Sequence, residues 1–430
     1  MDAIQIPNLF RHSTYQGRPK VLVQFEITPF VQSRCLHTTP FRDTPTPQNT
    51  AIPFRYRQSI STNTSNLMSE ATKLLTNSIR LPRGQKAIIA VEENSRLNDL
   101  EVLTICRSDL HVHTNRFELA MLFKRKGFEC VRFSDFDFSS YADASIDMFA
   151  HRVGKDKALT HYLINQAKRL LKPGGQLILS GMRQEGTKTY VAKAGEILGT
   201  TPVSTTRRSG ARIGKIQKSA DCDASLLDDK TYGQLREIEL DKETRMQSKP
   251  GIFGWNKIDQ GSKFLVENAP RLDGKTVLDL GCGYGYLSLH AHRSGASRIV
   301  ATDNNAAALA ACHENLNALG KAFELSSGDA GNEIDETFDA IWCNPPFHQG
   351  VKANAGLTAK FVRSLNRLLK EDGYALVVVN AFITFEKSAA DHFAEITEVA
   401  NNKSFKVLRL AKPIQPTPKP APVARKVIED

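Results

Sequence analysis

The sequence predicts an α/β protein made of two tandem halves, each built on a mostly parallel sheet. Strand-sized apolar runs alternate with helical segments from about residue 85 onward, which is the pattern of βα units. The segment LLKPGGQLIL, which begins at Leu170, is echoed by LLKEDGYALV, which begins 198 residues later at Leu368 (368 minus 170). Only the second half has a glycine-rich turn after a strand. We therefore expect two copies of one fold, with a ligand site in the second.

The two ends of the chain differ in composition from the halves. Residues 1–67 are rich in Pro, Thr, Ser, Gln and Arg and poor in acids, so we expect a mostly disordered basic extension. An organelle presequence has a similar composition and stays open as an alternative. We place the first half at 68–220, a polar linker at 221–250, the second half at 251–413 and a disordered Pro- and Lys-rich tail at 414–430.

The first half should contain strands at 87–91, 146–150 and 176–181 and helices at 116–127 and 157–171. Its strand ends lack the glycines and the NPPF that follow strands in the second half. Instead, EENS follows residue 91 and HRVG follows residue 150. We interpret this half as a degenerate copy that acts as a scaffold and binds RNA.

Basic residues near the end of the first half are candidate RNA contacts. Arg207, Arg208 and Arg212 lie along one extended stretch, where they could bind phosphates without reading sequence. A solvated strand face explains them equally well, because charges are common on edge strands. Farther along, Phe253 precedes a helix that should open near Asp259. Its ring could stack on a base or a cofactor, or it could staple the helix to the core.

In the second half, the apolar run at 277–280 predicts a buried strand, and a glycine-rich turn follows it at Gly281, Gly283 and Gly285. Such a turn lets a ligand approach bare backbone, but it also fits a dinucleotide-binding enzyme or a simple turn. Asp279 at the strand end favours a cationic ligand, such as the α-amino group of a sulfonium-bearing amino acid, since it would repel a pyrophosphate.

Two further strand ends carry polar side chains. Asp303 follows the strand at 298–302, where it could accept hydrogen bonds from ribose hydroxyls or cap the next helix. The strand at 338–343 runs into Asn344-Pro345-Pro346-Phe347. Prolines donate no backbone hydrogen bond, so this end presents the Asn344 side-chain oxygen and the Pro345 carbonyl as acceptors for an amine. Phe347 could stack on a planar substrate.

These residues resemble a known family. VLDLGCGYG, Asp303, Asp329 in SSGDA and NPPFHQG are similar to the class I S-adenosylmethionine-dependent methyltransferases of amino groups, most closely the bacterial ribosomal RNA guanine-N2 methyltransferases. The small-subunit methyltransferase C type is nearest in layout, with its large-subunit relative close behind. The resemblance implies two tandem Rossmann-like class I methyltransferase domains, the first degenerate and the second with a mostly parallel seven-stranded sheet.

The resemblance also implies roles for individual residues. Asp279, Gly281, Gly283 and Gly285 would line the methionine end of S-adenosylmethionine, Asp303 would hold its ribose, Asp329 would contact its adenine amine, and Asn344, Pro345 and Phe347 would receive the target base. The expected reaction is methyl transfer to the N2 amine of a guanine in ribosomal RNA, with the 16S-type small-subunit RNA favoured. The alternatives are a 23S guanine-N2 enzyme, a glutamine or adenine amino methyltransferase, and a ribosome-assembly module without activity.

Whole-chain composition agrees with an RNA substrate. The net charge is +11 with a sequence pI of about 9.2, which suits a polyanionic partner. Seven cysteines without C-x-x-C or zinc spacing predict reduced thiols and no metal site. The apolar runs are too short to span a membrane. We therefore expect a cytoplasmic monomer whose partner is ribosomal RNA or an assembling ribosomal subunit.

Overall fold

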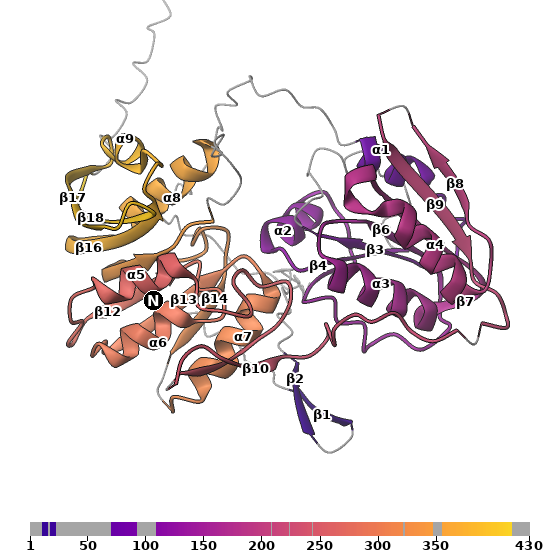
Figure 1. Ribbon diagram of the computed structural model, residues 1–430, viewed down its shortest axis with the longest axis horizontal. Coiled ribbons are helices and arrows are strands. Elements are labelled where there is room, and N and C mark those ends of the chain that lie inside the picture. Colours follow the sequence, from indigo (N-terminus) through magenta and orange to yellow (C-terminus); the bar gives the residue numbers. More distant parts are fainter. Residues whose placement is uncertain are drawn as a thin grey trace, which may run out of the picture. The chain divides into compact units, whose positions relative to one another are not determined.

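The computed structural model describes residues 11–15, 18–22, 70–92, 109–207, 209–222, 224–242, 244–320, 323–346 and 355–414. The chain divides into two compact units, residues 1–68 and 69–430. In the first unit β1 (Arg11–Tyr15) and β2 (Arg18–Leu22) form an antiparallel hairpin, which the sequence analysis did not expect. The second unit contains both halves of the repeat, and the course of the chain can be followed in Figure 1.

The first half is a seven-stranded sheet with helices on both faces. Its strands are β3 (Ala87–Val91), β4 (Leu110–Thr114), β5 (Val131–Phe133), β6 (Ile146–Arg152), β7 (Leu171–Met182), β8 (Val203–Thr206) and β9 (Ala211–Gln217). Its helices are α1 (Glu70–Ser78), α2 (Phe117–Arg125), α3 (Lys157–Leu170), α4 (Thr187–Leu198) and the short 3-10 helix η2 (Arg183–Glu185). The strand order is β5-β4-β3-β6-β7-β9-β8, and only the pairs involving β9 are antiparallel.

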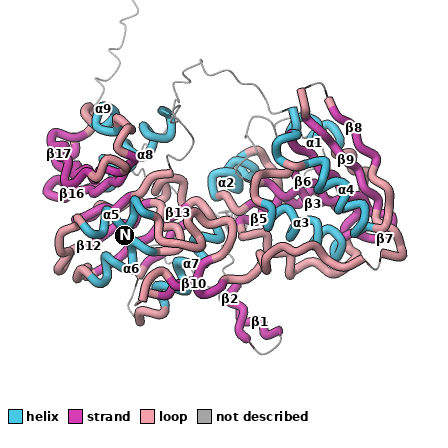
Figure 2. Tube along the Cα trace, in the orientation of Figure 1, coloured by secondary structure: helices cyan, strands magenta, loops and turns pink. Residues whose placement is uncertain are grey.

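The second half repeats this architecture. Its strands are β12 (Thr276–Leu280), β13 (Arg298–Asp303), β14 (Glu324–Ser327), β15 (Phe338–Cys343), β16 (Leu369–Asn380), β17 (Phe393–Asn401) and β18 (Phe405–Pro413). Its helices are α5 (Gln260–Glu267), α6 (Tyr286–Arg293), α7 (Ala306–Asn317), α8 (Ala355–Leu368) and α9 (Phe385–Ala389). The order β14-β13-β12-β15-β16-β18-β17 matches the first sheet strand for strand, so the tandem fold is confirmed. Figure 2 shows strands and helices alternating in both halves.

The core of the second half follows from alternation along its parallel strands. In β12, Val277 packs into the cluster that includes α5, α6 and α7, whereas Leu278 and Leu280 pack into the cluster that includes α8 and α9. A parallel strand buried on both faces reads as the continuous apolar run seen in the sequence. Between the halves, β10 (Arg236–Glu239) and β11 (Arg245–Ser248) form a separate antiparallel hairpin.

The two halves are joined by a contact between equivalent turns. The Phe117 N–H, just after β4, donates to the Asn304 carbonyl at 2.9 Å, and the Ala306 N–H, just after β13, donates to the Asn115 carbonyl at 2.9 Å. The Glu118 N–H adds a bond to Asn304 Oδ1 at 3.1 Å. Because β4 and β13 hold the same place in their sheets, this is a local pseudo-twofold contact. The degenerate half therefore holds the turn that follows β13.

Candidate functional site

Three strand ends of the second sheet meet at one edge. Leu280 at the end of β12 is in register with Thr302 of β13 on one side and with Cys343 of β15 on the other. The next residues, Gly281, Asp303 and Asn344, therefore lie on adjacent strands, which are about 4.8 Å apart in a sheet. The strand order also reverses between β12 and β15, and ligands of open α/β sheets bind at such switch points.

The glycine turn presents bare backbone on part of its length. A Cβ added to Gly281 or Gly283 would meet nothing within 4 Å, and both residues have positive φ angles. Gly285 differs, because a Cβ there would lie 2.9 Å from Cys312 Sγ of α7. Gly281 and Gly283 thus leave room for a ligand, whereas Gly285 allows the start of α6 to pack against α7.

The Asp303 carboxylate ties the end of β13 to the glycine turn. Its Oδ2 accepts a hydrogen bond from the Gly283 N–H at 2.9 Å, and its Oδ1 accepts one from the Asn305 N–H at 2.8 Å. Burial raises the pKa of Asp303, and these backbone donors oppose that shift. The helix-cap alternative is wrong, since Asn305 caps α7 by accepting from the Ala307 N–H at 2.9 Å. The Asn304 N–H acts on the same carboxylate, so of its roughly four acceptor positions about one remains for a ribose hydroxyl.

Asp279 lies inside the fold. It is 1% exposed, and its Oδ2 accepts from both the Ser288 N–H at 2.8 Å and the Ser288 Oγ at 2.6 Å. Burial, together with a smaller effect of the Asp303 charge, raises its pKa to about 7 against the opposing hydrogen bonds from Ser288. Its Oδ1 has no hydrogen-bond partner among the described residues. Asp279 therefore anchors α6 to β12 and has one oxygen left for a cation.

Asp329 lies beyond β14 and forms an ion pair with Lys360 of α8. Its backbone N–H donates to Glu333 Oε2 at 3.0 Å. Asp329, which was expected to contact the adenine amine, is thus already paired with a lysine of α8, the helix that follows the Asn344-Pro345-Pro346 segment. A ligand amine that binds Asp329 would have to share this carboxylate with Lys360.

Asn344 sits at the end of β15 with a fixed side chain. Its Nδ2 donates to Asp259 Oδ1 at 2.6 Å and to Ser262 Oγ at 2.9 Å. Pro345 is buried and Pro346 is exposed, while Phe347 lies outside the described residues. The sequence analysis placed Asp259 at the start of a helix, but neither Asp259 nor Ser262 was expected to contact Asn344. The helix-capping pattern at 259–262 was the only available signal.

Aromatic side chains differ in exposure around this edge. Phe253 is 54% exposed, which argues against stapling to the core, whereas Trp255 is partly buried and lies under the Arg236 guanidinium at 5.1 Å. Phe382, two residues past the end of β16, is 69% exposed and was missed by the sequence analysis. Since β16 is parallel to β15, Phe382 follows a strand end at the same edge as Asn344.

The equivalent edge of the first half is filled by its own side chains. Arg152, at the end of β6, forms a buried ion pair with Glu185 at 2.7 Å. His151 is fully buried with Nδ1 3.1 Å from the Ala90 carbonyl oxygen, and burial lowers its pKa to about 4. These contacts occupy the position that corresponds to Asn344 in the second half. At this position the carboxyl edge of the first sheet is therefore filled by internal packing.

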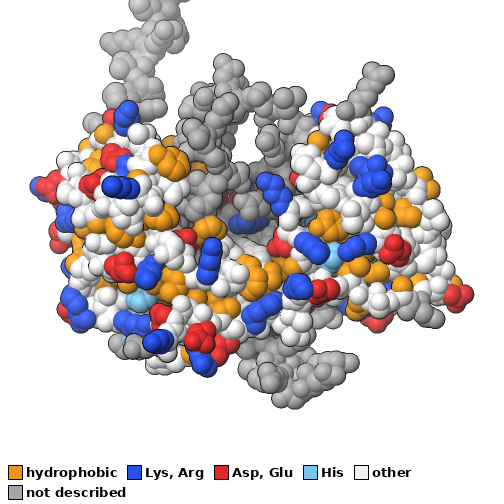
Figure 3. Space-filling view, in the orientation of Figure 1, with side chains coloured by type: hydrophobic (Ala, Val, Ile, Leu, Met, Phe, Trp, Pro, Cys, Tyr) orange, Lys and Arg blue, Asp and Glu red, His pale blue; other side chains and the backbone are white. Residues whose placement is uncertain are grey.

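The predicted basic residues fall near the carboxyl end of β7. Arg207 is exposed just after β8, and Arg212 of β9 is half-buried, in register with Gly181 of β7, and donates to Ser204 Oγ at 3.1 Å. Arg208 lies outside the described residues. On the face in Figure 3, Lys and Arg side chains are interspersed with acidic ones over both halves, so the net positive charge is not gathered into one patch there.

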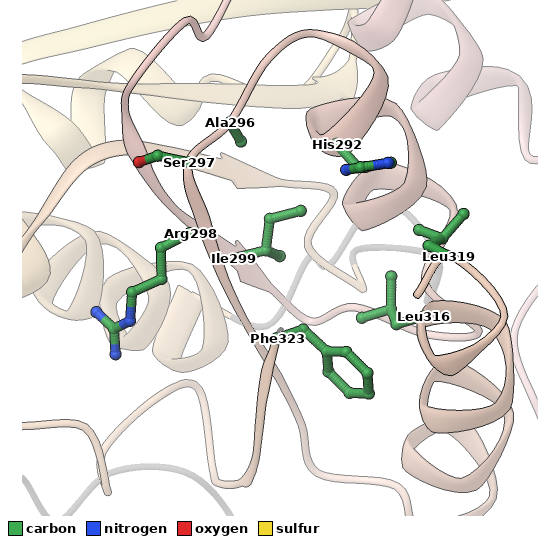
Figure 4. A pocket seen from close by; sticks show the side chains of 8 residues that line it. All are labelled: His292, Ala296, Ser297, Arg298, Ile299, Leu316, Leu319 and Phe323. Atoms are coloured by element: carbon green, nitrogen blue, oxygen red, sulfur yellow. The ribbon is translucent and has the colours of Figure 1, made fainter. Parts of the chain in front are cut away.

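The following features of the described residues do not add a site. Figure 4 shows a small apolar pocket at the amino end of β13, lined by His292, Ile299 and Leu316 among others, at the opposite edge from Asn344. Its volume of about 10 Å³ holds roughly one water molecule. Within the described ranges we find no His, Cys, Asp and Glu group suited to a metal, and no helix there is long and apolar enough to span a membrane.

Comparison with known proteins finds methyltransferases that are similar to this chain. Residues 243–409 match the family described as methyltransferase small domain. A relative from Shewanella amazonensis, named ribosomal RNA small subunit methyltransferase C, is 25% identical over 346 residues, which are 79% of this chain and 98% of the relative. The protein of that name from Klebsiella pneumoniae is 29% identical over 300 residues, 69% of this chain and 84% of the relative.

A solved structure shares the tandem fold. It is the 16S rRNA N2 methyltransferase of T. thermophilus in complex with AdoMet and guanosine, 22% identical with a TM-score of 0.69. The match covers 81% of this chain and 93% of that chain, so the likeness extends through both halves. At this identity it establishes the fold, while the family match at 243–409 lies in the second half.

Proposed function

We propose that this chain, an S-adenosylmethionine-dependent methyltransferase with a methyltransferase small domain in its second half, methylates the N2 amine of a guanine in small-subunit ribosomal RNA. The observation that carries the proposal is the placement of Gly281, Asp303 and Asn344 at the ends of three adjacent strands. Open backbone and a ribose acceptor thus lie beside an amine acceptor at a single edge.

The second half fits the cofactor. Gly281 and Gly283 leave open space beside the backbone, and Asp303 keeps about one acceptor position for a ribose hydroxyl. Asp279 Oδ1 and Asp329 are the acids available for the amino group and the adenine amine, respectively. Bound S-adenosylmethionine supplies an electrophilic methyl group. We assign all of these contacts to the second half, because Arg152 and Glu185 fill the corresponding edge of the first.

The amine is held by acceptors. The lone pair of an exocyclic amine is delocalised into the purine ring, so the free amine is a poor nucleophile. Acceptors at both of its N–H groups, the Asn344 Oδ1 and the Pro345 carbonyl, favour a pyramidal nitrogen whose lone pair can attack a methyl group. The product loses its proton to solvent, so the reaction requires no side-chain base at this edge. Phe347 and the exposed Phe253 are the residues we assign to stacking on the base.

RNA binding is assigned to the first half. A paired guanine must leave its helix to reach a strand end, and unstacking costs a few kcal/mol that phosphate contacts can offset. We assign such contacts to Arg207, Arg208 and Arg212. Charge reversal of Arg207 and Arg212 should weaken RNA binding and reduce the slope of log affinity against log salt by about one for each lost phosphate contact. Unchanged affinity and slope would leave this surface without a role.

The substrate can be tested directly. Ribosomal RNA from cells that lack this protein should accept labelled methyl groups, and nucleoside mass analysis should find N2-methylguanosine in the small-subunit RNA. Label in large-subunit RNA, adenine or protein glutamine would instead favour the alternative amine methyltransferases. Naked RNA and assembling subunits should be compared in the same assay. We propose that the active species is a cytoplasmic monomer, which light scattering of the working enzyme and cell fractionation would test.

A further inference from the structure

The Asn344 side chain donates hydrogen bonds to two residues at the start of helix α5. Asp259 is the N-cap of α5, and its Oδ1 accepts from the Ser262 N–H at 2.9 Å. The same oxygen accepts from Asn344 Nδ2 at 2.6 Å, and Ser262 Oγ is 2.9 Å from that nitrogen. Two oxygens of one helical turn therefore receive the two amide hydrogens of Asn344.

This arrangement selects one orientation of the amide. A carboxylate is an acceptor only, so rotating the amide by half a turn would bring the Asn344 oxygen against Asp259 Oδ1 with no hydrogen between them. The observed orientation instead places both N–H groups on Asp259 and Ser262 and leaves the Asn344 Oδ1 as an acceptor. That is the orientation required to receive an N–H of a substrate amine.

The Asp259 carboxylate is itself held in place. A Cβ on Gly261 would lie 3.1 Å from Asp259 Oδ1 and 3.3 Å from the Phe405 ring of β18, so this turn is packed closely against the sheet. Ser262 is 9% exposed. Asp259 is half-buried and Ser262 is buried, so the pair forms a closely packed support that connects the start of α5 to the end of β15.

We infer that Asp259 and Ser262 are positioning residues for methyl transfer, which hold the Asn344 amide with its oxygen toward the substrate amine. This inference rests on the proposed function and deepens it, because it assigns specificity for an N–H donor to three residues instead of one. A substrate with a hydrogen-bond acceptor in place of the amine would bring its lone pair against that of the Asn344 oxygen. The repulsion between the two acceptors would disfavour its binding.

Single substitutions at the two supports separate positioning from helix capping. Ser262→Ala removes the hydroxyl acceptor but keeps the backbone N–H that Asp259 caps, so kcat should fall about tenfold with the cofactor Kd unchanged. Asp259→Ala should lower kcat by about 100-fold, the order expected when a reacting group is misplaced by about 1 Å. Asp259→Asn keeps an oxygen acceptor for both donors, and it should restore most of kcat.

The loss of a helix cap is controlled in the first half. Asp156 is the N-cap of α3 and accepts from the Leu159 N–H at 3.0 Å, as Asp259 does in α5. Asp156→Ala should lower the melting temperature, as Asp259→Ala does, because each variant loses a helix cap, but it should leave kcat near the wild-type value. A similar fall in kcat in both variants would overturn the positioning role.

A double-mutant cycle with Asn344→Ala gives the decisive measurement. If Asp259 acts through Asn344, Asp259→Ala should change kcat by less than about twofold once Asn344 is alanine, since the supported group is gone. If the losses in kcat from Asp259→Ala and Asn344→Ala multiplied in the double variant, the positioning role would be overturned. The proposed function would still stand if the wild-type protein methylated guanine N2. Should the wild-type protein methylate another amine, the cycle is measured on that amine. Melting temperatures of the same four proteins, measured without substrate, should also show coupling between Asp259 and Asn344. Additive shifts in melting temperature would contradict the hydrogen bond between these two residues.

Discussion

At the scale of single residues, Asn344 and Asp303 lie at the same edge of the sheet, but substitutions at these two positions should have different effects on catalysis and on cofactor binding. Asn344→Ala removes the acceptor aligned with the amine, so kcat should fall by about 100-fold or more while the S-adenosylmethionine Kd stays within about twofold. Asp303→Ala should instead weaken cofactor binding, because it removes the ribose acceptor and the anchor of the Gly283 N–H. Single-turnover rates and calorimetry distinguish the two. Loss of cofactor affinity alone in both variants would contradict the role of Asn344.

Asp279 should make stability depend on pH. Burial raises its pKa from 3.8 to about 7, so between about pH 4 and pH 7 the folded protein holds a proton that the unfolded chain has released. The stability from this carboxyl is fully present below the unfolded pKa and is lost as pH rises through 7. Melting temperatures without cofactor should therefore fall from pH 5 to pH 7.5, and less steeply in Asp279→Asn.

Asp273 provides the control for that measurement. It is exposed and paired with Arg271, which lowers its pKa, so its carboxyl is ionised in both states across this range. Asp273→Asn should leave the slope of melting temperature against pH as it is in the wild-type protein. Equal slopes in wild type and Asp279→Asn would show that Asp279 titrates normally and is not held neutral by burial.

At the scale of elements, the glycine turn before α6 combines two requirements. Gly281 and Gly285 have φ angles of +85° and +92°, so alanine is strained at both. Only Gly285→Ala also places a Cβ 2.9 Å from Cys312 Sγ, so it should lower stability further, by the 1–3 kcal/mol typical of overpacking. Gly281→Ala should cost less stability but raise the cofactor Kd, because its Cβ enters the open space.

Thermal unfolding and cofactor titration of the two variants check this contrast. Adding Cys312→Ala to Gly285→Ala should recover part of the lost melting temperature, because it removes the crowded sulfur. The same addition to Gly281→Ala should recover none. Equal stability losses at the two glycines would mean that packing against α7 does not require Gly285.

At the scale of the whole molecule, the degenerate half should influence the cofactor site through the turn after β13. Ala306 is the first residue of α7, where proline is compatible with a helix, yet Ala306→Pro removes the N–H that donates to the Asn115 carbonyl. Since Asp303 precedes this turn, the S-adenosylmethionine Kd should rise about fivefold, the equivalent of one net hydrogen bond.

Proline at the first residue of another helix provides the control. Lys157 opens α3, so Lys157→Pro tests a similar change away from the contact between halves and should leave the cofactor Kd unchanged. If Ala306→Pro also bound the cofactor with wild-type affinity, the contact between halves would serve stability alone. A fragment that lacks the first half would then retain full cofactor binding.

The sequence by itself determined the parts of this protein that depend on local order. Apolar runs marked β3 and β15 with the same bounds that the structure gives and β12 from its second residue onward, and the echo between Leu170 and Leu368 revealed the tandem halves. Glycines and prolines at strand ends marked the edge where we propose the ligand site, because backbone freedom and missing donors are properties of the residues themselves.

Only the tertiary structure decided how those strand ends are used. Asn344 meets Asp259 across 85 positions and Glu118 meets Asn304 across 186, and such pairs depend on sheet register and packing that no local pattern encodes. The same holds for Gly285, which packs against Cys312, and for Arg152 and Glu185, which fill the edge of the first half. The sequence states which side chains are present, whereas the orientation of the Asn344 amide and the filling of the first half's edge depend on neighbours that only folding brings together.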